Sequence, residues 1–113
     1  MEGVILGLTL SIAGALTVWV SWLGSQRKLA PNGVVGLRLP ATRRSDAAWY
    51  AAHQAAAGPL GVAGGAAVAC GVGVLFTGLD VIGWVLAVIG LAALTTGVGV
   101  ATAAALRAAN QQR

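Results

Sequence analysis

The sequence predicts an all-α integral membrane protein with three transmembrane helices, and three observations lead to this class. Hydrophobic residues make up 58% of the 113 residues and charged residues 9%, whereas soluble proteins average about 45–50% and about 25%. The apolar residues gather in three uncharged blocks, at 3–23, 60–77 and 81–106. Each block approaches the roughly 20 residues that a helix needs to cross a hydrocarbon core. We expect one membrane domain over residues 1–113.

The first block is expected to remain in the mature chain as a helix. A cleaved signal peptide would carry basic residues before a shorter apolar core. Here Glu2 precedes the block, and Arg27 and Lys28 follow it. The second block is rich in Gly and Ala, which insert less favourably than Leu, Ile, Val and Phe. We therefore expect the second helix to depend on its neighbours to stay inserted.

Small residues recur at four-residue spacing in all three blocks. Residues four apart share a helix face, and small residues let helices approach closely in lipid. The three strips are Gly3, Gly7, Ser11 and Ala15; Gly61, Gly65, Ala69 and Gly73; and Ala93, Gly97, Ala101 and Ala105. These strips suit either a compact three-helix bundle or a homo-oligomer.

The basic residues predict the orientation in the membrane. All seven Lys and Arg lie either in the polar segment 24–58 or after the third block. By the positive-inside rule, segment 24–58 and the C-terminal tail are cytoplasmic and the N-terminus is outside. The net charge of +4 is thus a topology signal. We expect no nucleic-acid partner, because the segment lacks aromatic residues interleaved on a basic face.

The polar segment begins with residues that oppose helix formation. Asn32 and Gly33 form a typical turn pair, Gly36 permits backbone angles that other residues avoid, and Pro40 disfavours helix at the residue before it. Residues 31–42 are therefore expected to be extended or turning.

A short cytoplasmic helix is expected next, as Ser45 is a typical N-cap. It should run to about residue 57, before Pro59 and the second crossing. Trp49 and His53 are four apart and should share a face of this helix. His53 is expected at the membrane interface, hydrogen-bonded to a loop carbonyl.

Metal binding and catalysis are not expected of this segment. One His, one Cys (Cys70, at membrane depth) and three scattered carboxylates are too few ligands for a metal site. The carboxylate of Asp46 is the only one near His53 in the sequence, and no Ser or Cys has a recognisable base partner. We expect no cofactor and no enzymatic activity. Arg38, in an extended run, is suited to reach a phosphate or carboxylate or to cap a helix, and a headgroup contact is an equal alternative.

Eight of these residues together resemble the signature of the SdpI family of bacterial membrane proteins. In that family an N-x-x-x-G-x-R-x-P-x-T element leads through a Ser and a Trp to a His at the entrance of a transmembrane helix. The matching positions are Asn32, Gly36, Arg38, Pro40, Thr42, Ser45, Trp49 and His53. The sequence departs from the pattern at Leu39, where Thr is frequent. It also shows none of the membrane segments that longer members carry before this module.

The resemblance implies a location in the bacterial inner membrane and a role in toxic-peptide immunity or membrane-proximal signalling. The founding member protects a producing bacterium from its own secreted peptide and, when engaged, holds a transcriptional repressor at the membrane. A toxic peptide or a repressor would then be the partner, besides the lipid bilayer. The alternative is an accessory subunit of a larger membrane complex. Transport is disfavoured, because no block contains a charged residue.

Overall fold

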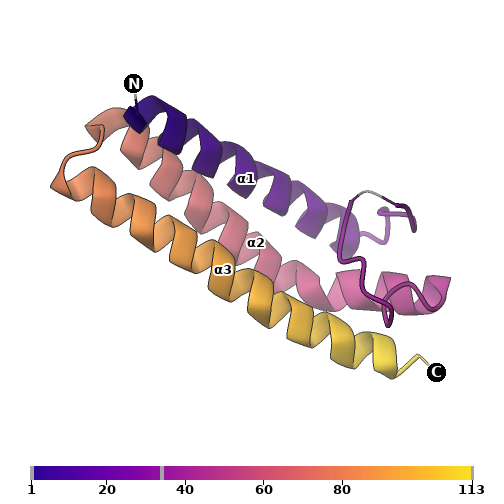
Figure 1. The fold of residues 1–113 in the computed structure, drawn as a ribbon. Helices are drawn as coiled ribbons and strands as arrows, with labels where there is room; N and C mark the ends of the chain where they lie inside the picture. Colours follow the sequence, from indigo (N-terminus) through magenta and orange to yellow (C-terminus); the bar gives the residue numbers. More distant parts are fainter. Residues whose placement is uncertain (1, 34, 113) are drawn as a thin grey trace.

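The computed structural model describes residues 2–33 and 35–112, which form three helices joined by a long loop and a tight turn. Helix α1 spans Glu2–Ser25, α2 spans Asp46–Thr77 and α3 spans Val81–Asn110. They form an elongated bundle with extents of 50 × 20 × 19 Å, drawn in Figure 1. Each helix is long and apolar enough to cross a membrane. The predicted all-α class with three spanning helices is confirmed.

Helix α2 is the central element of the bundle. Both α1 and α3 pack along α2, whereas α1 and α3 touch each other little. The N-terminus and the turn between α2 and α3 lie at one end, and the connecting loop, residues 26–45, lies at the other end together with the C-terminus (Figure 1). The predicted site residues therefore gather at one end of the molecule.

The separate short helix expected before the second crossing is absent among the described residues. Residues 46–57 instead form the first turns of α2, which continues through Pro59. A proline lacks the N–H that closes a helical turn, but membrane helices tolerate it where neighbours satisfy the freed groups. The carbonyl that loses this donor lies four residues earlier, on Ala55, which is exposed. Ser21 of α1 donates a hydrogen bond of 2.6 Å to the carbonyl of Ala57, in the same turn of the helix. Pro59 thus lies inside one continuous helix and does not mark its start.

The 32 residues of α2 exceed what a crossing requires. At 1.5 Å per residue the helix is about 48 Å long, against a hydrocarbon core of about 30 Å. Residues 60–77 alone approach the necessary length. We infer from this length that the turns before Pro59 lie outside the crossing. Figure 1 shows these turns beside the connecting loop.

Glycines repeat every seven residues along the contact between α1 and α2. A Cβ atom on Gly14 would lie 2.5 Å from the carbonyl oxygen of Gly64, and one on Gly7 would lie 2.9 Å from that of Gly71. The repeat runs in opposite directions along the two antiparallel helices. The backbones approach so closely that no side chain fits between them, which is how helices associate tightly in lipid.

The four-residue strip expected on the second helix has the wrong register. Gly65 and Ala69, two of its members, are exposed. Four residues exceed one turn of 3.6, so such a strip rotates by about 40° at each step. Seven residues fall within about 20° of two full turns, so a seven-residue repeat stays on one face.

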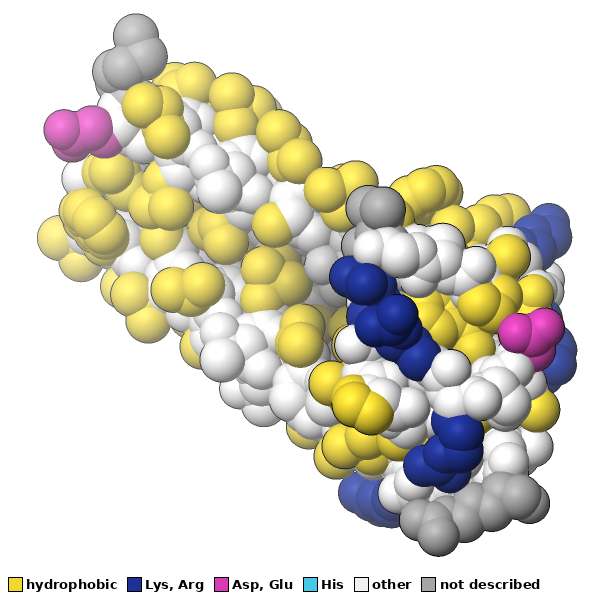
Figure 2. Space-filling model, turned by 45° about the vertical axis from the view of Figure 1, so that its right-hand side comes forward, with side chains coloured by type: hydrophobic (Ala, Val, Ile, Leu, Met, Phe, Trp, Pro, Cys, Tyr) yellow, Lys and Arg dark blue, Asp and Glu magenta, His cyan; other side chains and the backbone are white. Residues whose placement is uncertain are grey.

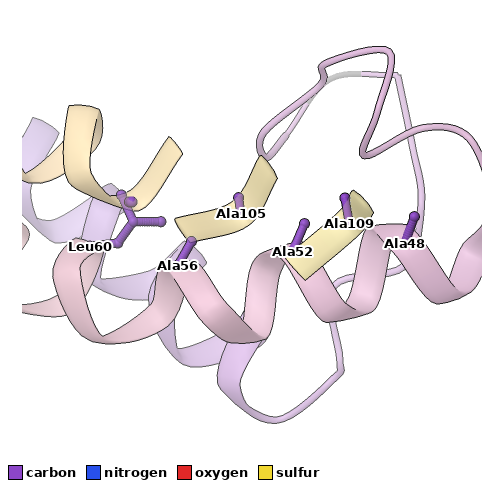
Figure 3. Packing of buried hydrophobic residues seen from close by; sticks show 7 residues of the cluster. Ala48, Ala52, Ala56, Leu60, Ala105 and Ala109 are labelled. Atoms are coloured by element: carbon purple, nitrogen blue, oxygen red, sulfur yellow. The ribbon is translucent and has the colours of Figure 1, made fainter. Parts of the chain in front are cut away.

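Alanines dominate the contact between α2 and α3 near the loop. Figure 3 shows side chains from the two helices meeting along this seam. The buried cluster consists of Ala48, Ala52, Ala56 and Leu60 of α2 and Ala101, Ala105 and Ala109 of α3. In the third block the expected strip is therefore largely correct, since Ala101 and Ala105 are buried and a Cβ on Gly97 would collide with Ala63.

Candidate functional site

The connecting loop folds back onto the first turns of α2, and His53 is the point of closest attachment. The imidazole is 2% exposed. Its Nε2 accepts a hydrogen bond of 2.8 Å from the backbone N–H of Leu37, and its Nδ1 lies 2.8 Å from the carbonyl oxygen of Trp49. The amide can only donate and the carbonyl can only accept. The proton of the neutral ring is therefore on Nδ1, and both ring nitrogens are satisfied.

Burial lowers the pKa of His53 below its ordinary value. The main cause is desolvation, which disfavours the charged ring, and the hydrogen bond to the Trp49 carbonyl opposes the shift. His53 lies before Pro59, outside the crossing portion of α2. The neutral form is therefore the one that the folded site favours.

Gly36 is required by the approach of the loop to His53. Its φ angle is +109°, a conformation that residues with a side chain rarely adopt. A Cβ atom at this position would lie 2.6 Å from Nε2 of His53 and 3.3 Å from the Trp49 ring. Both the backbone angle and the space exclude any other residue without a local shift.

Trp49 holds the beginning of the loop. Its side chain is 1% exposed, and Nε1 donates a hydrogen bond of 2.9 Å to the carbonyl oxygen of Leu29. The indole and the ring of His53 have centroids 4.3 Å apart. The prediction that these two residues share one helix face is confirmed. The expected partner of His53 is wrong, because the loop supplies the amide of Leu37 and no carbonyl.

Thr42 shapes the loop from inside. The side chain is fully buried, and its hydroxyl accepts from the N–H of Leu39 at 3.0 Å. The same hydroxyl lies 2.5 Å from the carbonyl oxygen of Leu37 and 2.9 Å from that of Leu39. These contacts fold the chain around Pro40, which is itself exposed. The bend keeps Leu37 in place against α2.

The ends of the loop are fixed by local capping. Ser45 is the N-cap of α2, as predicted, and its hydroxyl accepts from the N–H of Ala48 at 3.1 Å. Asn32 accepts from the N–H of Val35 at 2.7 Å and donates to the carbonyl of Ala30 at 2.9 Å. Both side chains are exposed, but both form hydrogen bonds with neighbouring backbone groups.

Arg38 differs from the other predicted site residues. It is exposed, and within residues 2–33 and 35–112 its guanidinium has no hydrogen bond, ion pair or ring contact. Three other basic residues are held. Arg27 lies 4.9 Å from the ring centre of Tyr50, Lys28 lies 4.7 Å from that of Trp22, and Arg44 donates to Asn110 at 3.3 Å. Arg38 follows Leu37 directly, so its backbone is fixed while its charged group is not.

Basic side chains form a band across the loop end of the molecule. Figure 2 shows the dark blue groups gathered there, away from the apolar sides of the bundle. The basic residues of the connecting loop and of the last turn of α3, which lie at this end, are Arg27, Lys28, Arg38, Arg43, Arg44 and Arg107. A cavity of about 340 Å³ opens beside the start of α2 and is lined partly by Arg43 and Arg44. In the described part of the chain, no three His, Cys, Asp or Glu side chains cluster as metal ligands would.

The backbone groups that bond to the site residues were not predicted from the sequence. The carbonyl of Leu29 and the N–H of Leu37 hold Trp49 and His53, yet every residue offers such groups. One signal was available: Leu29 and Leu37 are apolar residues in a polar segment, which is typical of a loop that packs back onto its own fold. Leu29 is indeed buried.

Comparison with known proteins identifies a family. The model of the SdpI/YfhL protein family matches residues 28–103. The matched stretch runs from the connecting loop into α3, is well over half of the chain and contains all eight predicted site residues. No curated protein and no solved structure matches the chain.

Proposed function

Because this chain belongs to the SdpI/YfhL protein family, we propose that it is an immunity-type membrane protein that acts through the cytoplasmic face of its connecting loop. The main supporting observation is that some signature residues hold the loop in place, whereas another is free to contact a partner. Gly36, Thr42, Trp49 and His53 turn inward and hold the loop, whereas Arg38 is exposed and has no intramolecular partner. A loop held this firmly presents Arg38 in a defined place.

The chemistry of Arg38 indicates what the loop engages. A guanidinium presents a planar fork of donors that matches a carboxylate or phosphate in bidentate fashion. An acidic patch on a protein partner is the class of surface that we infer, either on a toxic peptide or on a cytoplasmic regulator that the loop retains. No catalytic or cofactor role forms part of this function.

Survival under toxin challenge tests the immunity role. The chain is expressed in a sensitive bacterium, which is then exposed to a set of secreted peptide toxins. The wild type should raise survival against at least one toxin, and Arg38→Ala should remove most of that gain. Arg43→Ala is the matched control, because it removes another exposed arginine from the same loop. Unchanged killing by every toxin would count against immunity.

The proposed orientation places the loop in the cytoplasm of a bacterium with the N-terminus outside. The basic band lies at the loop end, and Glu2 and Asp80 lie at the opposite end. Such asymmetry favours the basic end inside. In a Cys70→Ala background, Asp80→Cys should react with an impermeant thiol reagent in intact cells, and Gly33→Cys only after permeabilisation. Labelling of Gly33→Cys in intact cells would reverse the topology.

A second candidate function is that of an accessory subunit in a larger membrane complex. A groove of about 410 Å³ runs between α2 and α3 and is lined largely by small residues, among them Ala63, Ala66, Ala93 and Gly97. Small residues at membrane depth favour helix docking. Native mass spectrometry after mild-detergent purification distinguishes the two functions. A stoichiometric large partner supports the subunit role, whereas a monomer or homo-oligomer opposes it.

A further inference from the structure

The loop is attached to α2 by one hydrogen bond that depends on protonation. Among residues 2–33 and 35–112, two side chains of α2 hydrogen-bond to the loop backbone: Trp49 through its indole N–H and His53 through Nε2. The indole does not titrate, so its bond to Leu29 is the same at all relevant pH values. Nε2 of His53 accepts from Leu37 only while it carries no proton.

The charges around His53 offer no counter-ion for a protonated ring. From the start of the connecting loop, just after α1, Arg27 reaches the neighbourhood by donating to Gln54 at 3.4 Å. From the loop, Lys28 and Arg38 adjoin the two residues whose backbones bond to α2. All three are cations, so none of them could act as a counter-ion for a protonated ring.

The remaining titratable groups do not change this balance. On α2, Asp46 lies seven residues before His53 and Tyr50 lies three before it, and α3 contributes Arg107 near this end. None of them forms a hydrogen bond or ion pair with His53 within residues 2–33 and 35–112. The acidic residues Glu2 and Asp80 lie at the far end of the 50 Å bundle.

We propose that the contact between Leu37 and His53 is an acid-sensitive latch, whose opening frees residues 35–42 from α2. A protonated ring carries N–H groups on both nitrogens. Nδ1–H still donates to the carbonyl of Trp49. The new Nε2–H, however, faces the N–H of Leu37, whose nitrogen lies 2.8 Å from Nε2. Two donors cannot share that space. When the loop swings away, water reaches the imidazolium and replaces the lost bond.

Opening would displace the exposed arginine together with the loop. Arg38 follows Leu37 directly, and its backbone position depends on the latch. Acidification would therefore withdraw the surface through which the protein acts. This regulatory consequence rests on the proposed function. The latch itself is measured on the isolated protein, so the latch and the proposed function can be refuted independently.

The first measurement is the titration of His53 by NMR in detergent micelles. His53 is the only histidine in the chain, so its ring ¹⁵N signals need no assignment by mutation. The latch requires the proton on Nδ1 at about pH 8 and a titration midpoint below the ordinary value of about 6.5. A proton on Nε2 at high pH, or a midpoint above that value, overturns the latch.

The second measurement is the accessibility of the loop to a thiol reagent. Ala41→Cys, partly buried against α2 and α3, is compared with the open position Gly33→Cys, each in a Cys70→Ala background. Taking the ratio of their labelling rates removes the effect of pH on thiol chemistry. As pH falls below about 6.5, the ratio should rise by up to about tenfold per unit, until the His53 midpoint is passed.

The matched variant is His53→Gln, which does not titrate. Its labelling ratio should be flat with pH, whether its amide holds the loop closed or leaves it open. A ratio that rises in His53→Gln as it does in the parent, or one that stays flat in the parent while His53 titrates, refutes the latch.

Discussion

The N–H of Leu37 donates to Nε2 of His53, and this 2.8 Å bond joins residues sixteen positions apart across the boundary between loop and helix. It fixes the tautomer of the ring, the path of the loop and the place from which Arg38 leaves the surface. Residues that stabilise this contact should therefore affect folding, whereas Arg38 should affect function alone.

Replacement of Gly36 by Ala should destabilise the loop. The new Cβ would have to fit 2.6 Å from Nε2 of His53, at a φ angle of +109°. We expect a loss of about 1–3 kcal/mol in the free energy of unfolding, seen as a lower midpoint of thermal unfolding in a mild detergent. Gly33→Ala is the control, because nothing lies within 4 Å of a Cβ there. Equal effects of the two variants would show that the loop is not packed as described.

The stability of the protein should fall on mild acidification. Burial lowers the pKa of His53, so between this lowered pKa and about 6.5 the unfolded chain binds more protons than the folded chain. The His53 contribution is therefore complete above about pH 6.5 and is lost as pH falls through the folded-state pKa. Thermal unfolding between about pH 8 and about pH 5.5 measures it. In His53→Gln this dependence should disappear, and its persistence would assign the effect to another group.

Arg38 and Thr42 should respond to mutation in opposite ways. Thr42→Val keeps the volume of a fully buried side chain but removes the hydroxyl that serves Leu37 and Leu39, at a cost of about 1–3 kcal/mol in unfolding free energy. Arg38→Ala removes an exposed side chain without an internal partner and should change stability by less than about 0.5 kcal/mol. Toxin protection should be lost in Arg38→Ala although the protein remains folded. A marked drop in its unfolding midpoint would make Arg38 a structural residue.

The elements that the sequence predicted correctly depend on short-range chemistry or on lipid. Three uncharged blocks were enough to place three helices, and a single serine before Asp46 was enough to place the start of α2. The pairing of Trp49 with His53 followed from four-residue spacing. Each of these inferences uses residues no more than a helical turn apart, or the simple requirement for apolar side chains in a bilayer.

The inferences that failed needed tertiary information. Pro59 was expected to separate two helices, but α2 continues through it while packed against both α1 and α3. The partner of His53 is a backbone amide, and which amide it is depends on the path of the whole loop. The signature residues could be identified from the sequence, whereas the folded chain was needed to show that Thr42, Trp49 and His53 are buried and that Arg38 is exposed.

The contact between α1 and α2 gives the sharpest test of the packing, because two adjacent glycines of α2 have opposite surroundings. A Cβ on Gly64 would lie 2.7 Å from the carbonyl oxygen of Gly14 and 2.8 Å from the side chain of Val18, whereas one on Gly65 would meet nothing within 4 Å. Gly64→Ala should therefore force the helices apart and lower the free energy of unfolding by about 1–3 kcal/mol. Gly65→Ala should leave it unchanged or raise it by up to about 1 kcal/mol, since alanine favours the helix. Thermal unfolding of both variants in the same detergent decides the matter, and a larger loss for Gly65→Ala would mean that α1 packs on a different face of α2.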